Sequence, residues 1–234
     1  MDTTMKRETK IYNLIILDES GSMCFIKRQA LSGLNETLQT IRSAQQKYPE
    51  QKQYVTILPF DTDNMRLLRD KVSIDEVRDL SPKEYNPCGG TPLYDAIGFG
   101  INSLLQTVSP DDSVLVTIIT DGEENSSVEY NVKSISTLIE SLKKQGWLFT
   151  YIGANQDAVR VAMQINISNA LNFVQDEDGT REMFAKERRS RSRFFSKHAR
   201  IFAELSAEDA CIAKNIMACD NSYFDGDEDN TDKD

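Results

Sequence analysis

The chain has 234 residues, of which 39% are hydrophobic and 27% are charged, and its formal net charge is −10. This composition excludes a fibrous or wholly disordered chain, and the acidic balance argues against a general nucleic-acid binder. The charge is uneven: residues 181–200 carry eight Arg or Lys against two Glu, whereas residues 220–234 carry seven Asp or Glu against one Lys. The sequence therefore predicts an acidic body, a basic segment and an acidic tail.

Membrane proteins and histidine-dependent enzymes are disfavoured by simple counts. No apolar run reaches the about 18 residues that a membrane-spanning helix needs, and the run at 11–17 is too short for a signal peptide. We therefore expect a cytoplasmic location. His198 is the only histidine and the four cysteines form no CxxC pair, so a His-dependent nucleophile or a zinc site is poorly supported.

Strands and helices are predicted to alternate along the chain. Short, continuously apolar runs predict strands at 11–17, 54–60, 65–74, 113–120, 147–153 and 170–174. Apolar positions three and four residues apart predict helices at 24–47, 92–107, 128–144, 155–165 and 179–203. Alternation of this kind, with strands apolar on both faces, is typical of a three-layer, doubly wound α/β domain. We expect a mainly parallel sheet of about six strands, with one antiparallel edge strand from the hairpin around residues 61–64.

The predicted elements divide the chain into three segments. Residues 1–205 are predicted to form the α/β domain and residues 206–219 a short helical extension. Residues 220–234 show no periodicity and are rich in acidic side chains, so we expect a disordered tail.

Oxygen-bearing side chains follow two of the predicted strands. Asp18 ends the first strand and begins the pattern Asp18-x-Ser20-x-Ser22, and Asp121 ends the strand at 113–120. Thr91 lies just before the second long helix. Asp18 and Asp121 each end a strand, so both are expected at the carboxyl edge of the sheet. Sheets of this kind bind their ligands at that edge. These side chains are hard oxygen donors, which suit Mg²⁺, Mn²⁺ or Ca²⁺.

The pattern resembles the metal-ion-dependent adhesion site (MIDAS) of the von Willebrand factor A (VWA) family. That site combines Asp-x-Ser-x-Ser with a distant Thr and a distant Asp, and the matching flanks here include Gly89-Gly90-Thr91-Pro92-Leu93 and Thr120-Asp121-Gly122. The resemblance covers about residues 10–203, and small stand-alone domains of bacteria and phages are similar to this chain. It implies a Rossmann-like VWA fold and a divalent cation, with Mg²⁺ expected and Mn²⁺ or Ca²⁺ as alternatives.

The resemblance also implies a function. The cation of such a domain is completed by a carboxylate from a partner protein, so we interpret the chain as a metal-dependent protein-protein interaction module and not an enzyme. Three further acidic side chains are expected at the rim of the site, where they could tune metal affinity: Glu19, Glu123 and Glu124. A carboxylate of the tail could instead occupy the open metal position: Asp225, Asp227, Glu228 or Asp229.

Several alternatives stay open. Asp, Ser and Thr after strands are also ordinary helix caps. A metal-dependent hydrolase or phosphatase of the haloacid type would need a second Asp two positions after Asp18, where Ser20 stands. A nucleic-acid-associated role could use the basic residues at 186–200, but their spacing with Phe194, Phe195 and other apolar residues favours a helix whose arginines face water.

Overall fold

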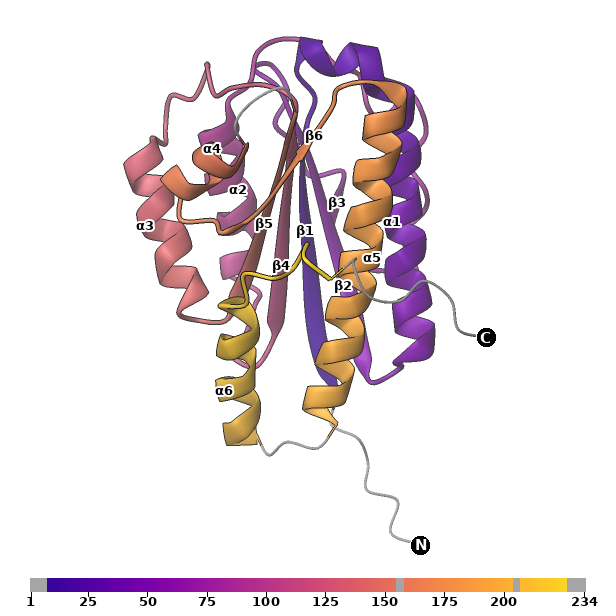
Figure 1. Cartoon of the computed structure of the whole chain (residues 1–234), viewed down its shortest axis with the longest axis vertical. Helices are drawn as coiled ribbons and strands as arrows, with labels where there is room; N and C mark the ends of the chain where they lie inside the picture. Colours follow the sequence, from indigo (N-terminus) through magenta and orange to yellow (C-terminus); the bar gives the residue numbers. More distant parts are fainter. Residues whose placement is uncertain (1–7, 155–157, 204–206, 227–234) are drawn as a thin grey trace, which may run out of the picture.

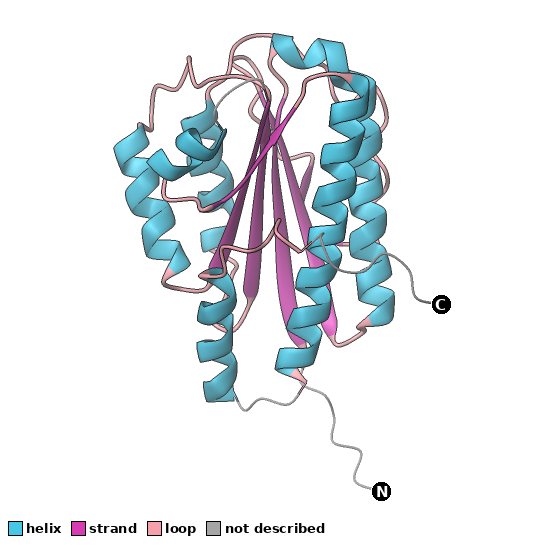
Figure 2. Ribbon diagram, in the orientation of Figure 1, coloured by secondary structure: helices cyan, strands magenta, loops and turns pink. Residues whose placement is uncertain are grey.

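A single six-stranded sheet is the centre of the fold (Figures 1 and 2). The computed structural model describes residues 8–154, 158–203 and 207–226. The strands are β1 (Thr9–Asp18), β2 (Gln51–Phe60), β3 (Arg69–Ser73), β4 (Ser113–Thr120), β5 (Trp147–Ala154) and β6 (Asn169–Phe173). Their order is β3-β2-β1-β4-β5-β6, with β3 antiparallel at one edge and the other neighbours parallel. The predicted fold class is confirmed.

Helices cover both faces of the sheet (Figure 1). One face carries α1 (Lys27–Lys47), which follows the 3₁₀ helix η1 (Gly21–Ile26), together with α5 (Glu177–Phe202) and α6 (Ala207–Ala218). The other face carries α2 (Leu93–Leu105), α3 (Val132–Lys143) and α4 (Ala158–Gln164). Within the described ranges, no helix combines the length and the apolar character that crossing a bilayer requires.

The alternation of side chains along β1 divides the core into two layers. Ile11, Ile15 and Leu17 belong to the layer under α1 and α5, whereas Leu14 and Ile16 belong to the layer under α2 and α3. Successive side chains of a strand point to opposite faces, so a strand covered on both sides is apolar throughout. This is why the central strands appear in the sequence as continuous apolar runs.

A buried ion pair joins α5 to the sheet. The guanidinium of Arg191, which is fully buried, donates from Nε to Glu187 Oε1 (2.7 Å), from Nη1 to Asn13 Oδ1 on β1 (2.7 Å) and from Nη2 to Thr117 Oγ1 on β4 (2.8 Å). The expectation that the arginines of α5 face water is therefore wrong for Arg191. Its charge is tolerated inside because a carboxylate and two neutral oxygens satisfy it.

His198 lies on the same buried face of α5. Its Nε2 is 3.0 Å from Ser113 Oγ, and its ring stacks on Phe202 with the ring centroids 4.0 Å apart. Burial lowers the pKa of His198 to about 3, so the ring is neutral at physiological pH. His198 is thus buried, as Arg191 is, because α5 is covered on more sides than its sequence suggests.

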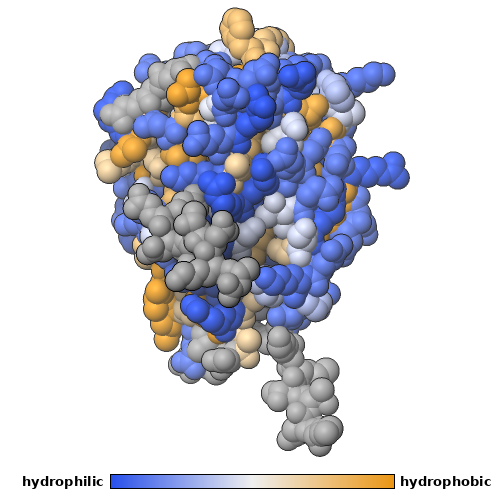
Figure 3. All heavy atoms as spheres, turned by 45° about the vertical axis from the view of Figure 1, so that its right-hand side comes forward, coloured by the Kyte–Doolittle hydropathy of each residue, from blue (hydrophilic) through white to orange (hydrophobic). Residues whose placement is uncertain are grey.

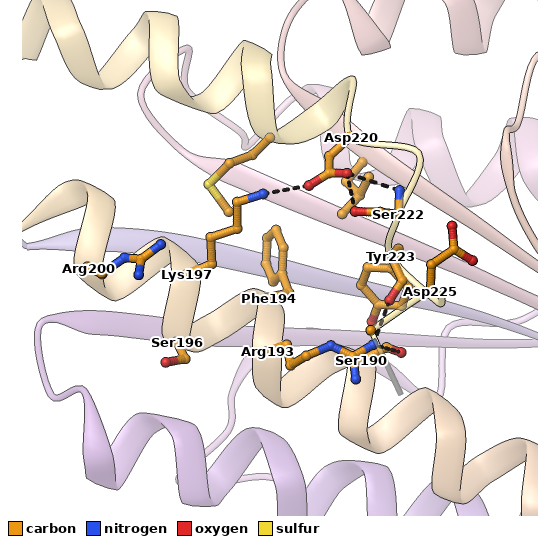
Figure 4. A pocket seen from close by; sticks show the side chains of 13 residues that line it. Ser190, Arg193, Phe194, Ser196, Lys197, Arg200, Asp220, Ser222, Tyr223 and Asp225 are labelled. Carbon is orange, nitrogen blue, oxygen red and sulfur yellow. Dashed lines mark hydrogen bonds and ion pairs between the residues drawn. The ribbon is translucent and has the colours of Figure 1, made fainter. Parts of the chain in front are cut away.

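The first part of the acidic tail is packed against α5 (Figure 4). Asp220 pairs with Lys197 at 2.5 Å, and Arg193 donates to the carbonyl oxygen of Tyr223 at 3.2 Å. Tyr223 and Phe224 are buried in the core layer under α5. The prediction of a disordered tail is therefore wrong for residues 220–226, because two aromatic side chains anchor them. The rest of the tail, 227–234, lies outside the described residues.

Removing one partner of the buried ion pair should destabilise the fold. Arg191→Ala leaves the Glu187 carboxylate buried without its cation, so the free energy of unfolding should fall by about 3–5 kcal/mol. Urea unfolding followed by circular dichroism measures this. Arg200→Ala, on an exposed position of the same helix, is the matched control and should stay within about 0.5 kcal/mol of the wild type. Equal unfolding midpoints for Arg191→Ala and Arg200→Ala would contradict the stabilising role of the pair.

Candidate metal centre

The pairing of β1 with β4 brings the two predicted aspartates together. These strands are parallel neighbours, with Leu17 opposite Ile119, so Asp18 at the end of β1 lies beside Thr120 at the end of β4. Asp121 is the next residue along. Both carboxylates therefore lie at the carboxyl edge of the sheet, the end of the molecule at which η1 lies in Figure 1.

Asp18 is completely buried and is held by neutral donors. Its Oδ1 accepts from the backbone N–H of Ser20 (2.7 Å) and its Oδ2 from Thr120 Oγ1 (2.6 Å). The hydroxyl of Tyr85 donates to the Asp18 carbonyl oxygen (2.6 Å) and fixes the backbone at this point. Burial raises the pKa of the Asp18 carboxyl to about 6, and the nearby charge of Asp121 adds to the rise. The site thus holds a carboxylate at an energetic cost.

The hydroxyls of the first loop connect the two aspartates. Ser20 Oγ and Ser22 Oγ are 3.1 Å apart, and Ser22 Oγ donates to Asp121 Oδ1 at 2.7 Å. Asp121 is only 6% exposed, and burial raises its pKa as well. The loop after β1 is therefore joined to the loop after β4 by a continuous chain of side-chain oxygens.

Thr91 enters the same site from the loop before α2. Its backbone N–H donates to Asn125 Oδ1 (2.9 Å), and the Asn125 N–H donates back to the Thr91 carbonyl oxygen (3.2 Å). A Cβ atom at position 122 would lie 3.3 Å from Thr91 Oγ1 and 3.9 Å from Ser22 Oγ. Gly122 therefore leaves open the space between these two hydroxyls.

The donor set fits a hard divalent cation. The structure brings together all five predicted residues: Asp18, Ser20, Ser22, Thr91 and Asp121. Among the described residues, no group of three or more His, Cys, Asp or Glu side chains could hold a metal. A cation at this edge would therefore depend on the hydroxyls in addition to the two carboxylates, which is chemistry that Mg²⁺ accepts.

Glu19 is not a rim residue. It is 1% exposed, and Arg66 binds it at both oxygens, with Nη1 2.6 Å from Oε2 and Nη2 3.2 Å from Oε1. The backbone N–H of Asn86 donates to the same carboxylate. The expectation that Glu19 adds negative charge at the rim is therefore corrected: its charge is neutralised by Arg66, and it fastens the loops beside β2 and β3 to the site.

Glu124 also has a positioning role. Its carboxylate accepts from the backbone N–H groups of Tyr94 (3.1 Å) and Ser127 (2.7 Å), and from the Ser127 hydroxyl (2.6 Å). It thereby ties the loop after β4 to the first turn of α2. Of the three expected rim residues, Glu123 alone is exposed.

Gln175 is a member of the site that sequence reasoning missed. Its Nε2 donates to Asp121 Oδ2 and to the carbonyl oxygen of Ser22 (2.9 Å). It directly follows the predicted strand at 170–174, so the rule that located Asp18 and Asp121, a polar residue directly after a strand, could have found it.

Comparison with known proteins supports the fold. No family model matches the sequence, and no curated protein sequence matches it. A von Willebrand factor type A protein from Catenulispora acidiphila aligns with 81% of this chain at 15% identity and a TM-score of 0.57. The pilus adhesin SpaC from Lactobacillus rhamnosus GG aligns with 81% at 12% identity and a TM-score of 0.60, and the SpRpn10 VWA domain with 75% at 11% identity and a TM-score of 0.51.

The likeness is one of fold. This chain spans 42% of the Catenulispora protein and 31% of the adhesin, but 94% of the SpRpn10 VWA domain. At these low identities the match shows how the elements are arranged and connected. The chain therefore has the fold of a VWA domain.

The raised pKa of Asp18 predicts how stability depends on pH in metal-free buffer. Between about pH 4 and 6 the native carboxyl keeps a proton that the unfolded chain has already lost, so the free energy of unfolding falls as pH rises. Relative to its value below pH 4, where Asp18 is protonated in both the native and the unfolded state, the free energy of unfolding should be lower by about 3 kcal/mol above pH 6.

Asp18→Asn should remove this dependence. The introduced amide can donate to Thr120 Oγ1, whose own hydroxyl can turn to the Gly122 carbonyl oxygen 3.1 Å away. In metal-free buffer we expect the variant to be more stable than the wild type at pH 7.5 and equal to it near pH 4, as measured by urea unfolding. Parallel pH profiles for the two proteins would show that Asp18 is not the group responsible.

Proposed function

We propose that this protein is a metal-dependent protein-binding module. A divalent cation, Mg²⁺ or a similar hard ion, is held by Ser20, Ser22 and Thr91 together with Asp18 and Asp121, and an Asp or Glu of a partner protein completes its coordination. The observation that carries this proposal is the pair of buried carboxylates beside three hydroxyls, held by neutral hydrogen-bond donors. A bound cation would supply the positive charge that this arrangement lacks.

Electrostatics supports a cation here. Burial of a carboxylate is costly unless it is paired or coordinates a metal, and two buried carboxylates raise each other's cost. The polar contacts of Asp18 are a backbone amide and a hydroxyl, which orient the group without neutralising it. Mg²⁺ takes about six oxygen ligands and keeps several as water, so a site with five side-chain donors retains a position for an external oxygen.

The surface around the site is suited to a protein partner. Three exposed apolar side chains lie in segments that follow parallel strands at the carboxyl edge of the sheet: Phe25 on η1 (85% exposed), Val128 after β4 (90%) and Val174 after β6 (62%). Figure 3 shows hydrophobic atoms projecting at the upper end of the molecule, where η1 lies in Figure 1. A single carboxylate bond to a metal is weak, and apolar contacts around it would add affinity and specificity. The adhesin among the similar structures is in keeping with an interaction role.

The nucleic-acid alternative receives less support. The guanidinium of Arg191 is inside the protein, Arg188 pairs with Glu36 at 2.5 Å, and Lys197 pairs with Asp220 at 2.5 Å. Much of the positive charge of the basic segment is thus used within the molecule. Nucleic-acid binding depends on cationic side chains that neutralise phosphates and release the counterions of the nucleic acid, so these internal pairs reduce what α5 can offer.

Ligation of the metal site by Asp225 of the same chain does not fit the geometry, whereas ligation by the tail of a neighbouring copy stays a prediction. Asp225 and Arg193 line one pocket on the side of α5 (Figure 4). Arg193 lies about 24 Å along the helix axis from Glu177, at roughly 1.5 Å per residue, and Glu177 marks the end of α5 nearest the site. The other proposed tail ligands lie outside the described residues: Asp227, Glu228 and Asp229.

Metal binding should stabilise the wild type and not Asp18→Asn. At a free Mg²⁺ or Mn²⁺ concentration about 100 times the dissociation constant, the gain is about 2.7 kcal/mol, which raises the unfolding temperature of a chain this size by several degrees. Differential scanning fluorimetry with and without EDTA measures it. Asp178→Asn, a carboxylate exposed at the start of α5, should respond like the wild type. An unchanged unfolding temperature for the wild type across millimolar Mg²⁺ and Mn²⁺ would rule out the site.

Partner binding should require the cation. Proteins retained from a lysate of the source cell by the immobilised wild type in Mg²⁺ should be lost in EDTA and with Asp18→Ala. A retained protein is then purified, and its exposed Asp and Glu residues are substituted one at a time. One such substitution should abolish binding measured by calorimetry. Partner affinity that is unchanged by EDTA would contradict the proposed function, and turnover of a generic phosphatase substrate in Mg²⁺ would favour the hydrolase alternative.

A further inference from the structure

Gln175 connects the candidate metal centre to the segment that follows the edge strand β6. It follows β6, which is separated from β4 by β5, yet its side chain reaches Asp121 after β4 and the Ser22 carbonyl oxygen after β1. These contacts join residues 54 and 153 positions apart in the sequence. One amide group therefore holds two loops that carry proposed ligands, and it does so from a third element.

The contact fixes the direction of the Asp121 carboxylate. Ser22 Oγ donates to Oδ1 at 2.7 Å, and Gln175 Nε2 donates to Oδ2. With both oxygens held, the carboxylate cannot rotate about its terminal bond without losing a hydrogen bond. The donor is a neutral amide, so it orients the negative charge without cancelling it. Hydrogen-bond partners of this kind orient the ligands of a metal site, and here the ligand also keeps its negative charge.

A neighbouring amide shows a different arrangement. Asn172 lies three residues earlier, on β6, and its Oδ1 accepts from the backbone N–H of Ala158 at the start of α4 (2.9 Å). That contact joins two secondary-structure elements away from the oxygen cluster. Gln175 instead bonds to Asp121 and to the peptide of Ser22, both within the candidate centre.

We propose that Gln175 is a positioning residue of the metal centre, which holds the Asp121 carboxylate and the Ser22 loop in the arrangement that binds the cation. This inference rests on the proposed function and names a residue outside the five-residue pattern. Gln175 acts through Asp121 and Ser22. Its removal should weaken metal binding by disordering those two ligands, while the fold, whose core it does not enter, stays intact.

The test compares Gln175→Met, which keeps the length of the side chain but has no N–H group, with Gln175→Ala and with Gln145→Met as the matched control. Gln145 is exposed after α3, far in the chain from the proposed ligands. Mn²⁺ affinity of the full chain is measured by titration calorimetry and electron paramagnetic resonance. We expect Gln175→Met and Gln175→Ala to bind Mn²⁺ about tenfold or more weakly than the wild type, and Gln145→Met to match it.

A second measurement examines positioning directly, without metal. Hydrogen exchange of the backbone amides at 20–23 is followed in EDTA, where faster exchange in Gln175→Met at an unchanged urea midpoint shows that the loop has been released. Equal Mn²⁺ affinity for the wild type and Gln175→Met, or unchanged exchange at 20–23, would overturn this inference alone. A wild-type chain that binds no Mn²⁺ would overturn the proposed function and this inference with it.

Discussion

The burial of Asp18 at the end of the central strand is the constraint around which this edge of the molecule is organised. A carboxylate with no exposed surface needs hydrogen-bond donors from the protein. For Asp18 these are the backbone N–H of Ser20 and the hydroxyl of Thr120. These bonds hold the loop after β1 against β4. The Tyr85 hydroxyl donates to the Asp18 carbonyl oxygen and fixes the backbone at that residue. The hydrogen bonds do not remove the charge, and the raised pKa of Asp18 expresses the remaining cost. The cation that we propose for this site would relieve this cost.

Two other buried charged side chains, unlike Asp18, are neutralised by an opposite charge within the protein. Glu19 is adjacent to Asp18 in the chain, but Arg66 neutralises it, and Arg191 is neutralised by Glu187 within α5. In both cases the opposite charge is part of the protein, so the pair serves structure: one fastens the loops around the site, and the other fastens α5 to the sheet. Asp18 and Asp121 differ because they bond to amides and hydroxyls. Their charges are therefore not neutralised within the protein, as those of Glu19 and Arg191 are.

The connection through Gln175 extends the centre beyond the residues of the recognised pattern. It links the segment after β6 to the loops after β1 and β4, so residues far apart in the chain determine one arrangement of oxygens. The apolar side chains around the same loops give the centre a surface on which a protein could dock. We propose that these features together form a binding face on the carboxyl edge of the parallel sheet, the location at which α/β folds commonly carry their ligands.

The alternation of strands and helices and the five oxygen donors could be predicted from the sequence, because periodicity and the residue that ends a strand are local properties. The sequence could not determine which charges would be paired. Arg66 lies 47 positions from Glu19 and Arg191 lies 178 positions from Asn13, and no local pattern relates such residues. For the same reason the packing of Tyr223 and Phe224 and the reach of Gln175 were settled only by the tertiary structure. Local sequence patterns indicated the proposed ligands, and long-range packing determined which neighbours hold them, because burial and pairing depend on contacts between distant parts of the chain.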